Sequence, residues 1–333
     1  MAPASPPRRR VSSQRAAREE IFRRRRRAAL GIGVVLFILL VWAVSAIGGG
    51  DGGASAEKPK AAELPDGGRV VLPRLRLVAY YGAPQHDELG ALGVGTPAEA
   101  AKKLLAQAEP FSQPGRPVMP VFELIVTLAQ ADPGDDGKFR MRQSPDVINA
   151  YLSAVREIKG LLILDVQPGQ STFTEEVELL EPWLSQPDVG LALDPEWNVP
   201  SGQVPGKVIG STTAATINQV SYYLARLRHA KDLPQKVLIV HQFTESMVED
   251  RDQVLDRPGV AIVFNIDGFG TADQKKNIYV QLVYHPGAGT AVRPPVGGGR
   301  FNGFKLFYKE DTGLMTPAQT LGLEPAPDVV VYE

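Results

Sequence analysis

Cysteine is absent from the 333-residue chain, and its absence excludes several classes of chemistry. Without a thiol there is no disulfide, no cysteine nucleophile, no thiolate metal site and no lipid-modified cysteine anchor. Histidine is scarce, with four residues in all, and the sequence shows no histidine cluster. We therefore expect no metal site and no cofactor.

Three nucleotide-binding and hydrolase motifs are also missing from the sequence. No Gly-x-Gly-x-x-Gly turn follows the first predicted strand, which argues against a dinucleotide-binding domain. No Gly-Lys-Ser/Thr phosphate loop is present. No Gly-x-Ser-x-Gly elbow follows a strand, which disfavours a Ser-His-Asp hydrolase.

Charge is almost balanced overall but unevenly distributed. Residues 1–27 hold ten arginines and two glutamates, a local charge of +8, so with a net charge of −1 the other 306 residues carry −9. A mildly acidic body argues against nucleic acid as the main partner.

A twenty-residue stretch without charge, residues 28–47, follows this basic arm. As a helix it would be about 30 Å long, enough to cross a membrane. The flanking arginines predict a cytoplasmic arm over 1–27 and a body outside the membrane. The alternative is a cleavable signal and a secreted protein. Residues 48–68 have the composition of a flexible linker, which leaves 69–333 as the extracytoplasmic domain.

Eight short apolar runs alternate with helical patterns in this body. The runs are Leu75–Tyr81, Val118–Leu124, Leu161–Val166, Val189–Leu193, Val237–His241, Val260–Ile266, Phe304–Tyr308 and Val329–Tyr332. Most are continuously apolar, as expected for parallel strands covered on both faces. This count predicts a (β/α)8 TIM-barrel-like domain, preceded by the transmembrane helix. A doubly wound open α/β sheet is the alternative.

Seven helices are expected between these runs. Capping patterns predict three of the helix starts, at Thr96, Ser144 and Thr316. The other helices are expected over residues 172–185, 212–230, 244–251 and 271–283.

Polar or aromatic residues follow nearly every predicted strand at its carboxyl end, where barrel enzymes collect their active-site residues. The candidate catalytic residues are Glu196, Asp194 and Asp165. The candidate substrate-binding residues are Tyr81, Glu123, Gln167, Trp197, His241, Gln242, Asp267 and Tyr308. Carboxylates at strand ends also cap helices or pair with cations, and His241 fits equally well as a buried core histidine.

Asp194 and Glu196 are the sharpest feature of this set. Residues two apart in a strand point to the same face, about 7 Å from one another. Gly190 and Ala192 lie on the same face of the strand as Asp194 and Glu196, and this face is expected inside the barrel. Leu193 lies on the opposite face and is expected to face the helices. Two nearby carboxylates push each other's pKa values apart. One can then act as a general acid while the other stays ionised.

The run Asp194-Pro195-Glu196-Trp197, at the end of the fourth strand, resembles the family-18 chitinases among the glycoside-hydrolase barrels. In that family an Asp-x-Glu ends strand 4 and its glutamate is the acid. The resemblance implies that Glu196 protonates the glycosidic oxygen and that Asp194 assists. It covers a handful of residues, because Leu191 and Gly190 stand where that family has further aspartates. The body is also similar in character to surface proteins of high-GC Gram-positive bacteria.

These features predict a membrane-anchored glycoside-hydrolase-like protein that acts on a cell-envelope or environmental polysaccharide. A non-catalytic glycan-binding or envelope-organising module on the same barrel is the alternative, with Tyr81, Trp197 and Tyr308 along its groove. Phosphodiester cleavage by His241 with carboxylates is a third reading. The expected partners are the membrane, through the N-terminal helix, and a polysaccharide or oligosaccharide. The sequence leaves the oligomeric state open.

Overall fold

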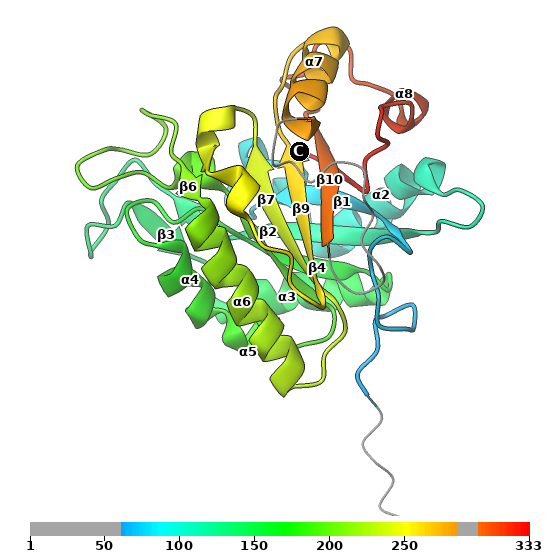
Figure 1. Ribbon diagram of the computed structural model, residues 1–333, viewed down its shortest axis with the longest axis horizontal. Coiled ribbons are helices and arrows are strands. Elements are labelled where there is room, and N and C mark those ends of the chain that lie inside the picture. The colour runs from blue at the N-terminus through cyan, green and yellow to red at the C-terminus, as the bar shows by residue number, and fades with distance from the viewer. Residues whose placement is uncertain (1–60, 285–298) are drawn as a thin grey trace, which may run out of the picture. The chain divides into compact units, whose positions relative to one another are not determined.

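Eight parallel strands close into a barrel in the computed structural model, which describes residues 61–284 and 299–333 (Figure 1). The barrel strands are β1 (Arg76–Gly82), β2 (Val118–Ala129), β4 (Leu161–Val166), β5 (Val189–Leu193), β7 (Lys236–Gln242), β9 (Val260–Ile266), β10 (Gly299–Leu306) and β11 (Val329–Tyr332). Each strand pairs with the next one along the chain, and β1 pairs with both β2 and β11. This closure confirms the barrel and shows that the open-sheet alternative is wrong.

All eight predicted runs are strands, but one of them is displaced. The seventh was expected over Phe304–Tyr308, whereas β10 spans Gly299–Leu306 and leaves Tyr308 beyond its end. Three short strands were not expected. β3 (Arg140–Arg142) adds to β2 in the antiparallel sense, and β6 (Thr212–Thr213) pairs with β8 (Val248–Glu249).

Helices cover the outside of the barrel in every connection between barrel strands except the one from β7 to β9 (Figure 1). They are α2 (Pro97–Ala108), α3 (Pro145–Glu157), α4 (Phe173–Leu179), α5 (Glu181–Leu184), α6 (Ala214–Ala230), α7 (Ala272–Val283) and α8 (Pro317–Leu321). The three predicted caps are confirmed, because the side chains of Thr96, Ser144 and Thr316 each accept a backbone N–H three residues on. The helix expected over 172–185 is divided into α4 and α5.

The helix expected over 244–251 is wrong. Two 3₁₀ turns, Glu245–Met247 and Arg251–Gln253, flank β8 in this region. Asp250 has φ 54 and ψ 36, the left-handed conformation. A right-handed helix cannot continue through such a residue, so the connection from β7 to β9 has no α-helix.

Alternation along the strands produces two apolar layers. Leu191 and Leu193 face the helices, and Ala192 packs inside the barrel. The interior is crowded at Gly190, where an added Cβ would lie 2.5 Å from Ile163 Cδ1. The prediction of which β5 residues face the helices and which face the barrel interior is therefore confirmed.

The predicted arm (1–27) and membrane helix (28–47) lie outside the described residues, as does most of the linker. The described chain forms a unit that begins at Ala61, and Leu64 is already buried in its core. No helix within 61–284 or 299–333 is long and apolar enough to cross a membrane.

Candidate active site

A layer of polar side chains closes the carboxyl end of the barrel. Every strand of the barrel contributes one inward-facing member, at or near its end except in β2, where Glu123 lies mid-strand: Tyr81, Glu123, Asp165, Asp194, His241, Asn265, Lys305 and Glu333. The residue two positions before most of these, such as Ala79, Ile163 or Ile239, is apolar and packs inside the barrel. Because side chains alternate along a strand, the apolar layers lie below and the polar layer lies above them.

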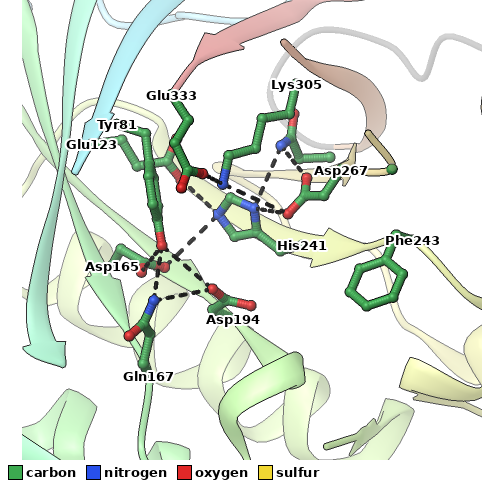
Figure 2. A network of polar contacts seen from close by, with 12 residues as sticks. Tyr81, Glu123, Asp165, Gln167, Asp194, His241, Phe243, Asp267, Lys305 and Glu333 are labelled. Carbon is green, nitrogen blue, oxygen red and sulfur yellow. Dashed lines mark hydrogen bonds and ion pairs between the residues drawn. The ribbon is translucent and has the colours of Figure 1, made fainter. Parts of the chain in front are cut away.

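His241 is the centre of this layer, and both of its ring nitrogens have carboxylate partners (Figure 2). Nε2 lies 2.8 Å from Glu123 Oε1, and Nδ1 lies 2.6 Å from Asp267 Oδ2. The amide of Asn265 donates to the other oxygen of Asp267 at 2.6 Å. Burial alone would lower the pKa of His241, but the charges of Asp267 and Glu123 outweigh it and raise that pKa well above its ordinary value.

Tyr81 links two further carboxylates. Its hydroxyl lies 3.2 Å from Asp165 Oδ2 and 3.4 Å from Asp194 Oδ2. The side-chain amide of Gln167 donates to the Tyr81 hydroxyl at 3.0 Å and to Asp194 Oδ2 at 3.4 Å. Figure 2 shows these four side chains converging from the ends of β1, β4 and β5.

Burial dominates the electrostatics of the two linked aspartates. It raises the pKa of Asp194 to about 6, although His241 and Lys305 act in the opposite direction. The pKa of Asp165 is raised well above its ordinary value, first by burial and then by the charge of Asp194. The two carboxylates therefore compete for ionisation.

Lys305 supplies the second cation of the layer. Its ammonium lies 2.6 Å from Glu333 Oε2, 4.0 Å from Asp267 Oδ2 and 3.6 Å from the centre of the Tyr81 ring. Burial lowers the pKa of Lys305, but Glu333 and Asp267 more than offset this and raise it. Lys305 is thus a fixed positive charge.

A pocket of about 500 Å³ opens above this layer. Its polar lining includes Tyr81, Glu88, Gln167, Asp194, Glu196, Asp267, Lys305 and Glu333. Its apolar lining includes Leu89, Ile125, Leu128, Trp197, Phe243, Phe269, Ile278 and Phe307. A mostly apolar cavity with a few convergent polar groups is typical of a small-molecule site.

Glu196 lies in the pocket wall, in the 3₁₀ turn Pro195–Trp197 that follows β5. The strand ends at Leu193, so the extended geometry expected for Asp194 and Glu196 is wrong. The two acids nevertheless line the same pocket. No described residue forms a hydrogen bond or ion pair with the Glu196 carboxyl. Burial, and after it the charge of Asp194, raises the pKa of Glu196 to about 7.

The structure separates the predicted site residues into two sets. Asp194, Glu196, Tyr81, Gln167, Trp197 and Asp267 line the pocket. The others do not. Glu123, Asp165 and His241 are fully buried beneath it, and Gln242 is buried and accepts a hydrogen bond from Arg251. Tyr308 is 43% exposed and stacks on Tyr332, away from the pocket.

Sequence reasoning missed Lys305, Glu333 and most of the apolar lining. Lys305 was missed because the seventh strand was placed too late, which moved its end to Tyr308 and Lys309. The correct register makes Lys305 an inward residue near the end of β10, next to Val331 of β11. Glu333 directly follows the last strand, so the rule used for the other strand ends would have found it.

One group of described residues has the composition of a metal site: Glu123, Asp165 and His241. Their ligand atoms lie within 4.8 Å of one another. The expectation of no metal site depended on the number of histidines, and this group contains only one.

Neither a protein-family model nor a curated protein matches this chain. The resemblance to family-18 chitinases therefore depends on the barrel and on the run from Asp194 to Trp197.

Proposed function

We propose that this chain is a membrane-anchored, extracytoplasmic glycoside-hydrolase-like protein that acts on a cell-envelope or environmental polysaccharide. Glu196 is its general acid. The membrane anchor and the orientation rest on the sequence of residues 1–47, and the chemistry rests on the pocket at the mouth of the barrel.

The surroundings of Glu196 carry the proposal. A general acid at neutral pH needs a raised pKa and a carboxyl that is free to meet the substrate. Glu196 has a pKa raised to about 7, lines the pocket and has no side-chain partner among the described residues. Asp194, Asp267 and Glu333, which line the same pocket, are already engaged, the last of them by Lys305 at 2.6 Å. Asp194 accepts from Tyr81 and Gln167, and Asp267 accepts from Asn265.

Asp194 is the partner of Glu196. The Glu196 proton passes to the glycosidic oxygen as the bond to the anomeric carbon breaks and the leaving sugar departs as an alcohol. Water then adds to that carbon and gives a proton back to the Glu196 carboxylate, which restores the acid. The hydrogen bonds from Tyr81 and Gln167 hold Asp194 in place, where its carboxylate stabilises the positive charge that develops on the sugar. Asp165 does not line the pocket, so we do not assign it this role.

Aromatic side chains support a sugar ligand. Trp197, Phe243, Phe269 and Phe307 all line the pocket, and Phe269 is 64% exposed. The apolar faces of sugar rings stack on such side chains, while the polar lining can receive their hydroxyl groups.

The test is a panel of insoluble and soluble polysaccharides, assayed with the full chain for release of reducing ends and for retention on each polysaccharide. Release from at least one glycan is expected. Retention without any release would contradict catalysis and favour a glycan-binding module. Neither retention nor release would contradict the glycan assignment itself.

A further inference from the structure

Directly beneath the pocket, Glu123 of β2, Asp165 of β4 and His241 of β7 bring one nitrogen and two carboxylates together (Figure 2). We propose that these three side chains bind a divalent transition-metal ion, with Zn²⁺ and Mn²⁺ as the ions that suit the donors. A set of one imidazole and two carboxylates fits both ions.

Two buried oxygens in this cluster have no hydrogen-bond partner. Glu123 Oε2 and Asp165 Oδ1 are both inaccessible to solvent, and no described residue donates to either. The two side chains are fully buried. A buried polar oxygen without a partner is costly. A metal ion between the two carboxylates removes that cost.

The third donor, His241, already has the partner that metal-bound histidines use. Nδ1 lies 2.6 Å from Asp267 Oδ2, and Asn265 fixes Asp267 from its other side at 2.6 Å. With the Nδ1–H donated to Asp267, Nε2 faces the two acids and coordinates the ion once its proton, hydrogen-bonded to Glu123 in the metal-free protein, is released. This carboxylate–histidine–metal arrangement sets the tautomer and orients the ring.

The distances fit one ion after small adjustments. Nε2 lies 2.8 Å from Glu123 Oε1 and 3.8 Å from Asp165 Oδ1. Ligands about 2.1 Å from a common ion are about 3.0–3.4 Å apart in octahedral or tetrahedral geometry. All three ligand atoms lie within 4.8 Å of one another, so an ion between them requires the two carboxylates to move closer to it.

The charge balance favours a dication. Four carboxylates of the polar layer are nearly or fully buried: Glu123, Asp165, Asp194 and Asp267. Lys305 lies 2.6 Å from Glu333 Oε2 and 4.0 Å from Asp267 Oδ2, so its charge is directed at those acids. No lysine or arginine of the described residues forms an ion pair with Glu123 or Asp165, whose one basic neighbour is His241. A dication between the two acids supplies positive charge where the low-dielectric interior otherwise lacks it.

The metal-site proposal does not rest on the proposed glycan chemistry. None of its three ligands lines the pocket, so hydrolysis can fail while the metal binds, and the reverse. The ion joins three strands, β2, β4 and β7, so we expect it to stabilise the barrel.

The test uses the full chain in a mild detergent, purified with a tag free of histidine and stripped with a chelator. Titration calorimetry with ZnCl₂ and with MnCl₂ is expected to show one equivalent per chain for at least one ion. A hundredfold excess over Kd should raise Tm by about 5 °C. X-ray absorption at the metal edge should show one imidazole with oxygen ligands.

Glu123→Gln and Asp165→Asn each remove a metal ligand. Each should weaken metal binding by more than the roughly 10- to 100-fold that is typical when a hydrogen-bond partner of a ligand is removed. Both variants remove a buried charge without changing shape, so we expect them to fold, which their metal-free Tm checks. Asp194→Asn is the matched control, since it removes a charge from the same layer without removing a ligand, and should bind much more tightly than either. Failure of the wild type to bind either ion, equal binding by all variants, or a spectrum without imidazole would each overturn the proposal.

Discussion

The side chains of Asp194 and Glu196 face one pocket from different surroundings. Tyr81 and Gln167 donate hydrogen bonds to Asp194, whereas no described residue donates to Glu196. Both carboxyl groups have pKa values raised by burial, to about 6 and about 7. This order assigns the proton to Glu196 and the negative charge to Asp194 near neutral pH.

The first prediction concerns the pH dependence of hydrolysis. A general acid works only while it is protonated, so kcat/KM should fall as pH rises through about 7, the pKa of Glu196. Because the charge of Asp194 contributes to raising that pKa, Asp194→Asn should move the falling limb to lower pH and also reduce the rate. A falling limb that stays in place in Asp194→Asn would show that the two groups are not coupled.

The second prediction concerns Tyr81, whose hydroxyl joins Asp165, Asp194 and Gln167. Tyr81→Phe keeps the ring beneath Lys305 but leaves these buried groups short of a partner. We expect it to lower the free energy of unfolding by about 1–3 kcal/mol, measured by urea denaturation. Tyr308→Phe is the control, because the hydrogen bond that its hydroxyl donates to Gln107 is exposed to solvent, and it should have a small effect. Equal effects of the two substitutions would contradict the role given to Tyr81.

A third prediction tests the aromatic lining. Phe269 is 64% exposed and lines the pocket, so Phe269→Ala should weaken oligosaccharide binding by about 3- to 10-fold with little loss of stability. Tyr222 is 52% exposed but does not line the pocket, so Tyr222→Ala should leave binding unchanged. Calorimetric titration with the oligosaccharide makes the comparison. A loss of equal size in both variants would argue against stacking at Phe269.

The fourth prediction concerns topology. Five consecutive arginines, Arg23 to Arg27, precede the apolar stretch, and the positive-inside tendency puts the body outside the cytoplasmic membrane. Protease added to intact cells should therefore degrade residues 61–333, detected with an antibody to the barrel. A body protected until the cells are lysed would contradict this orientation.

The barrel could be predicted because its strands are continuous apolar runs between capped helices. The parity of β5 could be read from Gly190, Ala192 and Leu193, because strand side chains alternate. The connection over 244–251 could not, because its helical pattern is interrupted by the left-handed backbone at Asp250. Such a conformation is not evident from the residue type.

The sequence predicted several of the residues of the site, but it did not predict how they are arranged. Asp194 and Glu196 were found because they follow a strand, but the 3₁₀ turn at Pro195 was not foreseen. The position of His241 between Glu123 and Asp267 depends on partners 118 and 26 residues away. Which strand end meets which depends on barrel closure, and spacing along the chain does not encode it.

The most direct test of the central claim is Glu196→Gln, assayed on whichever glycan the wild type cleaves. Because the amide keeps the shape but cannot give up a proton, kcat should fall by about 10²–10⁴-fold while the affinity for the same oligosaccharide stays within about threefold. Glu88→Gln, at an exposed acid of the same pocket, should retain most of the activity. Unchanged turnover in Glu196→Gln would contradict the account.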